Sequence, residues 1–413
     1  MASNIITGID IGSSHIRIAV CEYSQREGTF VIRSLTKAPS DGLKNGYVVN
    51  SASASASLSS ALREAERTAG GRIKRALVSV SGIGLGVASD SNTVAISRAD
   101  SIVSEFDINR LIEESETRVS ERPNVKVLHS IPSEYKVDGR KVLGKPHGYA
   151  GNRLELRTTF ITCATPHLEA LVGAIESNGV EVMDVYALPI AESFVTLSAS
   201  ARNAGTVLVN IGAETVSLMT CEDGLPTSLK VFPIGSSDIT HDIALGLRIP
   251  LDAAEEMKLS TNSDRSSAKN GKGEKRVNEI INARLSDIFE LIDTHLKKIG
   301  RSGLLPAGII FTGEGSRVYG LEELAKRELG LPARIARNSI PEHLSASGLS
   351  ADRESKSASR ARERLERARD GEWSAVLGLC VLGMSRAPEE SLGIRVAKQT
   401  KSTILGFLKQ FLP

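Results

Sequence analysis

The sequence predicts an α/β fold that contains two related halves. Two apolar, β-rich runs flank a Gly-Ser-Ser turn in GIDIGSSHIRIAV (8–20), which is typical of a β-hairpin with small residues at its tip. The segment VLVNIGAETVSLM (207–219) repeats this order of apolar run, small tip and apolar run, which indicates an internal duplication. Elsewhere strand-like runs alternate with segments of helical periodicity, such as PHLEALVGAIESNG (166–179).

Length and composition indicate a folded protein of several domains. A chain of 413 residues is too long for one hydrophobic core. Its 41% hydrophobic and 24% charged residues argue against disordered, collagen-like and disulfide-scaffold classes. The formal charge is only +2, so bulk electrostatics does not indicate a nucleic-acid surface, and we expect no nucleic-acid partner.

Three observations predict a cytoplasmic protein. The four cysteines are scattered without a CxxC pair, which is typical of a reducing compartment and excludes the usual zinc spacings. No apolar run approaches the roughly 18 to 20 residues that a membrane span needs. The N-terminus has no basic region, and Asp10 interrupts its first apolar stretch, so we do not expect a secretory signal.

Three polar stretches are expected to be loops or insertions. SASASAS (51–57) is of low complexity, and the apolar spacing of 58–71 predicts a surface helix that ends at Gly70. Residues 260–276 have the composition of a flexible loop. In 351–372 the opposite charges largely cancel, which favours an exposed helix or a disordered insertion over a nucleic-acid arm.

The first hairpin carries a candidate phosphate site. Phosphate is bound by backbone N–H groups at close range, and Gly12, Ser13 and Ser14 supply the small residues that such a turn needs. Asp10, at the end of the preceding strand, could hold Mg²⁺ through its waters. The alternative is an ordinary hairpin in which Asp10 caps the turn.

Two further segments extend this candidate site. Gly212, Ala213, Glu214 and Thr215 occupy the equivalent tip of the second hairpin, and two opposed phosphate loops can clamp a triphosphate. Residues 308–329 are predicted to form a strand, a Gly-rich turn and an amphipathic helix whose N-terminus could face a nucleotide.

With these motifs, the chain resembles the actin/Hsp70/sugar-kinase ATPase superfamily and, within it, the bacterial cell-division FtsA family. The two hairpins look like the phosphate loops and FTGEG (311–315) like the adenosine loop. The closer resemblance to FtsA is carried by the segments GLKNGYVVN (42–50), IKRALVSVSG (73–82), IPSEYKVDG to GNRLE (131–155), ITCA (161–164), 233–259 and 281–292. Only 340–372 fits poorly.

The resemblance implies an actin-like two-lobed ATPase fold with duplicated β-sheet domains and an FtsA-type inserted small subdomain. The implied domains are a first lobe at 1–82, completed by 164–203 and 373–384; the inserted subdomain at 83–163; a second lobe at 204–242 and 305–340; its upper subdomain at 243–304; a charged insertion at 341–372; a linker at 385–399; and an amphipathic membrane-targeting helix at 400–413.

The resemblance also implies that ATP or ADP, with Mg²⁺, binds in the cleft between the lobes. Glu255 and Lys258 match the acidic residue and the lysine that contact the nucleoside; without the resemblance they would be an ordinary i, i+3 surface ion pair. The residues implied to bind the nucleotide are Asp10, Gly12, Ser13, Ser14, Asn210, Gly212, Ala213, Glu214, Thr215, Glu255, Lys258, Gly313, Glu314, Gly315 and Ser316, with Asp10 also serving the metal. No catalytic residue and no hydrolase triad can be assigned.

Three residues depart from the superfamily pattern. Asn210 stands where an aspartate organises magnesium and the attacking water, and an amide cannot act as a general base. ATP hydrolysis is therefore expected to be weak or absent. Glu214 and Glu314 replace glycines of the second phosphate loop and the adenosine loop, where their charge could weaken nucleotide binding.

The C-terminal tail is predicted to be a membrane anchor. On a helix, one apolar face is flanked by two lysines; these residues are Lys401, Ile404, Leu405, Phe407, Leu408, Lys409, Phe411 and Leu412. Residues 391–413 contain four basic and no acidic residues, which suits an anionic lipid surface. The alternative is a terminal helix that packs on its own core.

Together these features predict a peripheral protein on the cytoplasmic face of the cell membrane at the division site. The resemblance implies that it tethers filaments of the tubulin-like division GTPase, self-associates into filaments and contacts later divisome proteins. One alternative is an actin-like pilus-assembly ATPase, whose second phosphate loop can also read Ile-Gly-Ala-Glu. Another is a small-molecule kinase of the same superfamily, which would need a catalytic aspartate near the transferred phosphate.

Overall fold

The computed structural model describes residues 4–24, 29–263, 272–339 and 356–386, and its strands form three larger sheets and one small hairpin. The first sheet has the order β11-β6-β1-β2-β3 and the second β14-β13-β12-β15-β16. The strands of the first are β1 (Asn4–Ile11), β2 (His15–Ser24), β3 (Thr29–Pro39), β6 (Arg75–Val80) and β11 (Glu181–Ala187). Those of the second are β12 (Thr206–Ile211), β13 (Val216–Glu222), β14 (Leu225–Phe232), β15 (Ile309–Thr312) and β16 (Ala333–Ile335).

The two sheets have the same topology. In each, the first three strands in sequence run antiparallel as neighbours, and the last two join on the other side of the first strand as parallel strands. Asp10 pairs in register with Arg17, and Asn210 pairs with Ser217 at the equivalent position. The predicted α/β class with duplicated sheets is confirmed.

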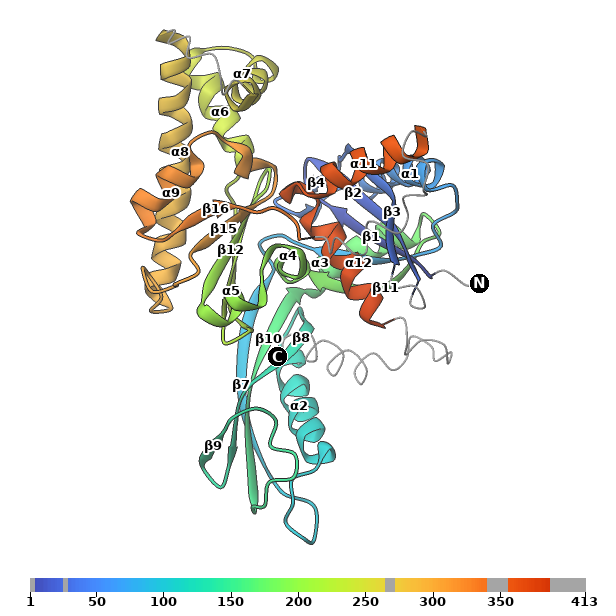
Figure 1. Ribbon diagram of the computed structural model, residues 1–413, viewed down its shortest axis with the longest axis vertical. Helices are drawn as coiled ribbons and strands as arrows, with labels where there is room; N and C mark the ends of the chain where they lie inside the picture. Colours follow the sequence, from blue (N-terminus) through green and yellow to red (C-terminus); the bar gives the residue numbers. More distant parts are fainter. Residues whose placement is uncertain (1–3, 25–28, 264–271, 340–355, 387–413) are drawn as a thin grey trace.

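Each sheet is packed against helices, and the two layered units are called here the first and second lobes (Figure 1). The helices of the first lobe are α1 (Ser51–Ala69), α3 (Thr165–Glu176), α4 (Leu188–Thr196) and α12 (Ser374–Arg386). The helices of the second lobe are α6 (Ser236–Leu247), α7 (Leu251–Ser263), α8 (Lys272–Lys298) and α9 (Leu321–Leu329). The hairpin of β4 (Leu43–Lys44) and β5 (Tyr47–Val48) precedes α1, and α5 (Ala199–Ala204) precedes β12.

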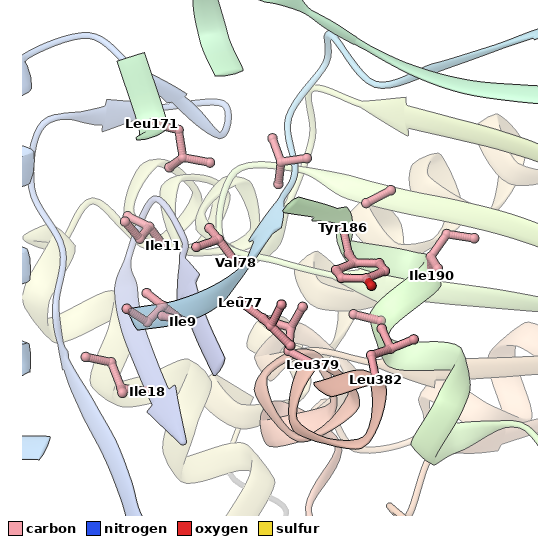
Figure 2. Close-up of a cluster of buried hydrophobic side chains, with 14 of the residues drawn as sticks. Ile9, Ile11, Ile18, Leu77, Val78, Leu171, Tyr186, Ile190, Leu379 and Leu382 are labelled. Carbon is pink, nitrogen blue, oxygen red and sulfur yellow. The ribbon is translucent and has the colours of Figure 1, made fainter. Parts of the chain in front are cut away.

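The core of the first lobe covers both faces of its sheet, with α1 and α3 on one face and α4 and α12 on the other (Figure 2). Ile9 and Val78 on the central strands and Ile190 on α4 are fully buried, and burial of each such side chain stabilises the fold by about 1.5–3 kcal/mol. The same cluster includes Leu208 and Met219 from the second sheet. The two lobes therefore share one continuous apolar core beneath the cleft.

The inserted subdomain is a third unit with its own core. Its sheet has the order β7-β10-β8-β9, formed by β7 (Gly86–Ala95), β8 (Val125–Val137), β9 (Arg140–Val142) and β10 (Arg153–Ala164). The helix α2 (Glu105–Ser120) begins at a capping box of Ser104 and Asp107 and buries Leu111 against this sheet. Figure 1 shows this unit extending away from both lobes.

Helix α1 begins earlier than predicted, because the low-complexity stretch 51–57 is helical. The side chain of Asn50 accepts a hydrogen bond from the N–H of Ser53, and Ala54 is buried on the same face as Leu58. The predicted end at Gly70 is correct, since Gly70 adopts the left-handed conformation and donates to the carbonyl of Glu66.

Part of the charged insertion is also helical. The helix α11 (Lys356–Ala368) packs beside β3 and is followed by the short 3₁₀ turn η2 (Gly371–Trp373). The domain boundaries given above stay a prediction, and the expected membrane helix at 400–413 lies outside the described residues. In the part of the chain that the structure describes, no helix is both long and apolar enough to cross a bilayer.

Candidate functional site

The turns of the two hairpins are closed by equivalent backbone hydrogen bonds. The N–H of Gly12 donates to the carbonyl oxygen of His15 at 3.0 Å, and the N–H of Gly212 donates to that of Thr215 at 2.9 Å. A Cβ atom on either glycine would lie 3.0 Å from that carbonyl oxygen, so both turns favour glycine. Such tight turns of small residues present backbone N–H groups to an anion.

These turns line one cleft together with the segment that follows β15. The predicted residues that line it are Asp10, Gly12, Ser13, Ser14, Asn210, Gly212, Ala213, Glu214, Thr215, Gly313 and Glu314. Residues that were not predicted also line it, namely His15, Arg17, Gly46, Ser81, Leu188, Glu192, Ser217, Glu372 and Ala375. The cleft leaves about 70 Å³ of free volume, whereas pockets for small molecules usually have about 300–1,000 Å³.

Four predicted residues are not among those that line this cleft. Gly315 and Ser316 lie buried in the 3₁₀ turn η1 (Glu314–Arg317), and helix α9 begins only at Leu321, so the Gly-rich turn does not lead directly into a helix N-terminus.

Lys258 on α7 is buried; its Nζ lies 2.7 Å from Glu255 and donates to the carbonyl of Ser236 on α6. This lysine joins the two helices.

Asp10 lies buried at the floor of the cleft. Its Oδ1 accepts a hydrogen bond of 2.6 Å from the hydroxyl of Ser79 on the neighbouring strand β6. Burial raises the pKa of Asp10, while the charge of Arg17 and the Ser79 hydrogen bond oppose this shift. In the described residues, no group of three or more His, Cys, Asp and Glu side chains is placed to hold a metal ion.

A second buried carboxyl, Glu192 on α4, was missed from the sequence. Its Oε1 accepts a hydrogen bond of 2.6 Å from the amide of Asn210, and its Oε2 accepts one of 3.1 Å from the hydroxyl of Thr312. Burial, with a contribution from the charge of Asp10, raises the pKa of Glu192 to about 8, so this carboxyl is neutral at pH 7. The available signal was a single acidic residue within the apolar helix 188–196.

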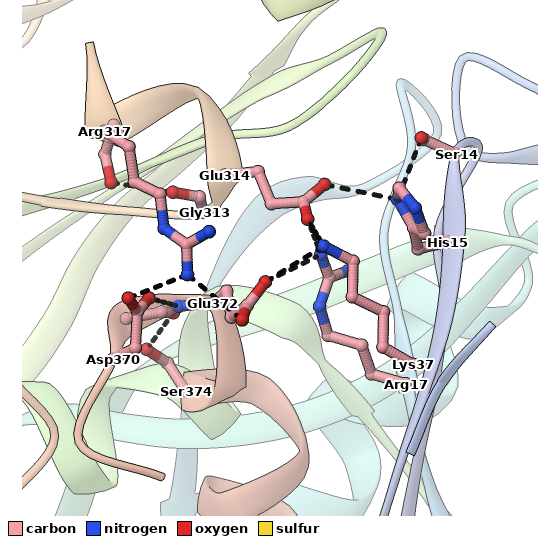
Figure 3. A network of polar contacts seen from close by, with 12 residues as sticks. Ser14, His15, Arg17, Lys37, Gly313, Glu314, Arg317, Asp370, Glu372 and Ser374 are labelled. Atoms are coloured by element: carbon pink, nitrogen blue, oxygen red, sulfur yellow. Dashed lines mark hydrogen bonds and ion pairs between the residues drawn. The ribbon is translucent and has the colours of Figure 1, made fainter. Parts of the chain in front are cut away.

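Glu314 crosses from the second lobe to three basic side chains of the first (Figure 3). Its carboxylate lies 3.2 Å from His15 Nδ1 and 3.0 Å from Arg17 Nη2, and it also contacts Lys37 Nζ on β3. Burial, together with the charges of Lys37 and Arg17, lowers the pKa of His15 to about 4. At pH 7 the carboxylate is therefore paired with Arg17 and Lys37 and contacts a neutral imidazole.

Glu372 in η2 makes a parallel set of ion pairs. Its carboxylate lies 3.2 Å from Lys37 Nζ, 3.8 Å from Arg17 and 3.0 Å from Arg317, and Arg317 also pairs with Asp370 at 2.7 Å. Burial would raise the pKa of Glu372, but the charges of Arg317, Lys37 and Arg17 outweigh it and lower the pKa. This residue lies in the part of the chain that fits the family pattern poorly, so the resemblance could not assign it.

Glu214, at the tip of the second hairpin, also reaches the first lobe. Its Oε2 accepts a hydrogen bond of 2.6 Å from the backbone N–H of Asn45 in the turn between β4 and β5. The next N–H, of Gly46, donates to the hydroxyl oxygen of Ser13 at 3.0 Å. One turn of the first lobe is thereby bonded to both phosphate-type hairpins.

The sequence matches two family models that together span more than half of the chain. The model "SHS2 domain inserted in FTSA" matches residues 84–162, and "Cell division protein FtsA" matches residues 207–351. The chain belongs to the FtsA family. The cell-division protein FtsA of Pseudomonas aeruginosa is 29% identical over 351 residues, covering 81% of this chain and 83% of that relative. FtsA of Bacillus subtilis is 28% identical over 355 residues, covering 81% of this chain and 79% of that relative.

Solved structures share the fold of this FtsA-family chain. A chain of the PilM-PilN type IV pilus biogenesis complex superposes with a TM-score of 0.63 at 18% identity, covering 92% of this chain and 98% of that one. The ethanolamine utilization protein EutJ of Carboxydothermus hydrogenoformans gives a TM-score of 0.52 at 14% identity, covering 92% and 90%. The predicted actin-like fold with an inserted small subdomain is confirmed.

Proposed function

We propose that this FtsA-family protein tethers filaments of the tubulin-like division GTPase to the cytoplasmic face of the cell membrane at the division site. It self-associates there. It binds ATP or ADP in the cleft between its lobes. The observation that carries the proposal is the membership of a cell-division family, together with paired phosphate-type turns that line one cleft. Later divisome proteins are further candidate partners.

The membrane part of the proposal rests on the sequence of the C-terminal tail. Residues 400–413 combine an apolar helical face with lysines, and the positive charge of 391–413 favours anionic lipid. An isolated helix of this length is marginal in water, so we expect it to fold on the lipid surface.

Liposome co-sedimentation tests the tether. We expect the full chain to pellet with anionic liposomes and to bring the division GTPase with it, whereas a chain truncated after Gln399 releases both. Liposomes of neutral lipid are the control for the charge of the tail. A truncated chain that still pellets with anionic liposomes contradicts the anchor assignment.

The cleft has part of the chemistry that a nucleotide with magnesium requires. The turns at Gly12 and Gly212 can present N–H groups to phosphate oxygens, and Asp10 can bind a hydrated Mg²⁺ ion. The free volume of about 70 Å³ is too small for a nucleotide until side chains move. Saturable binding of ATP in calorimetry is the expected result, and its absence contradicts the nucleotide part of the proposal.

Hydrolysis is proposed to be weak or absent. Asn210 cannot accept a proton, and the adjacent Glu192, whose pKa is raised to about 8, is mostly protonated at pH 7 and has both oxygens bonded to Asn210 and Thr312. The same chemistry weighs against a small-molecule kinase. The pilus-assembly alternative shares the fold, but the sequence matches are to the FtsA family.

A further inference from the structure

We propose that Glu314 and Glu214 are built-in substitutes for bound phosphate. Each carboxylate binds groups of the protein that would otherwise bind the phosphates of a nucleotide. These contacts hold the two lobes together without nucleotide. A nucleotide must displace both side chains in order to bind. The inference rests on the proposed nucleotide binding at the same cleft and specifies what sets its affinity.

Glu314 contacts the basic side chains that would bind phosphate. Arginine and lysine are the side chains that bind phosphate most strongly, and Arg17 lies at the exit of the first phosphate-type turn, where it lines the cleft. The carboxylate of Glu314 already forms an ion pair with this guanidinium at 3.0 Å and also contacts Lys37. Arg17 Nε has no hydrogen-bond partner among the described residues, so the guanidinium has a further donor for an anion.

The charges around Glu314 are balanced. The carboxylates of Glu314, Glu372 and Asp370 are matched by the cations of Arg17, Lys37 and Arg317, as the ion pairs show, and the set of six is neutral. Adding the negative charges of a di- or triphosphate to a neutral, partly buried cluster is unfavourable. Moving Glu314 out would leave this set with a net charge of +1 and would free Arg17 and Lys37 for a phosphate.

Glu214 makes a similar contact at the other turn. Its carboxylate accepts the N–H of Asn45 at 2.6 Å; Asn45 directly precedes Gly46, which lines the cleft, and phosphate oxygens accept hydrogen bonds from backbone N–H groups of this kind. Both glutamates project from the second lobe and bind groups of the first. Both also stand where the family resemblance expects glycine, which has no side chain to fill the cleft.

The test compares Glu314→Gln and Glu214→Gln with the wild type in the full-length protein. Glutamine keeps the size of the side chain and removes its charge. The matched control is Glu323→Gln, an exposed glutamate on α9 of the same lobe. Affinity for MgATP and MgADP is measured by calorimetry, and lobe contact is measured without nucleotide by amide hydrogen exchange over 13–19 and 42–47.

We expect each cleft variant to bind nucleotide about tenfold more tightly than the wild type and to exchange faster in both segments without nucleotide, while the control matches the wild type. Unchanged affinity and unchanged exchange in Glu314→Gln would overturn the inference. If no variant binds nucleotide but exchange still rises, the nucleotide part of the proposed function fails and the inter-lobe contact stands.

Discussion

Asn210 replaces the expected aspartate, yet a carboxyl group lies beside it on Glu192. Sequence reasoning identified the loss because position 210 belongs to a recognisable turn, and it missed Glu192 because that residue comes from helix α4, 18 positions earlier. Nothing in the local sequence indicates that the side chain of Glu192 contacts residues of β12 and β15. Contacts of this kind depend on how elements pack, which local patterns do not encode.

The raised pKa of Glu192 predicts a specific pH dependence of stability. Between the ordinary carboxyl pKa of 4.5 and about 8, the folded protein keeps a proton on Glu192 that the unfolded chain loses. The free energy of unfolding therefore falls as pH rises through this interval, by up to about 1.4 kcal/mol per unit. We expect Glu192→Gln to lose this slope and to gain stability relative to the wild type between pH 5 and pH 8.

Urea unfolding at pH 5, 6.5 and 8 measures this difference. Asp10 and Arg17 also act on Glu192, so the informative quantity is the difference between variant and wild type at each pH. The exposed variant Glu323→Gln should keep the slope of the wild type. If Glu192→Gln also keeps the slope of the wild type, the carboxyl of Glu192 is not the source of the pH dependence.

At the scale of elements, close backbone contacts decide where the cleft residues lie. Helix α12 crosses α4 at Gly378, where a Cβ atom would lie 1.8 Å from the carbonyl oxygen of Ala191. Ala191 directly precedes Glu192, and Gly378 follows Glu372 within the same C-terminal segment. The crossing therefore holds the part of α4 that carries Glu192 against the helix that follows η2.

A methyl group added at this crossing should destabilise the fold. We expect Gly378→Ala to lower the free energy of unfolding by about 1–3 kcal/mol, because the helices must separate. Gly173→Ala in α3 is the matched control, since nothing lies within 4 Å of its added Cβ, and it should raise stability by about 0.5–1 kcal/mol. Thermal unfolding of both variants provides the measurement, and equal effects would contradict the close contact.

The predicted helices differ from the observed ones for local reasons. Helix α1 extends through 51–57 because Asn50 caps it and its alanines face the core, whereas composition alone suggested a loop. The strand before Gly313 was predicted correctly, but the 3₁₀ turn η1 delays helix α9 to Leu321. Caps and short 3₁₀ turns depend on single contacts, so periodicity does not find them.

At the scale of the whole molecule, the distribution of cores separates the inserted subdomain from the lobes. The lobes share an apolar cluster through α4, which also includes Ile131 of β8 and Ile161 of β10, while α2 and the rest of the inserted sheet bury a separate one. We therefore expect the subdomain to unfold locally when its own core is damaged.

Leu111→Ala tests this separation. Leu111 is fully buried on α2, and its truncation should cost about 2–5 kcal/mol within the inserted subdomain. Amide exchange should rise across 84–162 and stay near the wild-type rate in β1, β6 and β12. Leu143→Ala, at a side chain that is 89% exposed, is the control. A matching rise in the lobes would show that the three units unfold together.

The sequence by itself determined the α/β class, the duplication, the two phosphate-type turns and the family, because these depend on local patterns of apolar, glycine and small residues. Only the tertiary structure decided what fills the cleft. Glu314 meets Arg17 and Lys37, and Glu192 meets Asn210, across long separations in the chain. Their charges and protonation are set by burial and by neighbours brought together in folding, so the sequence could name Glu314 as a departure but not the cations that hold it.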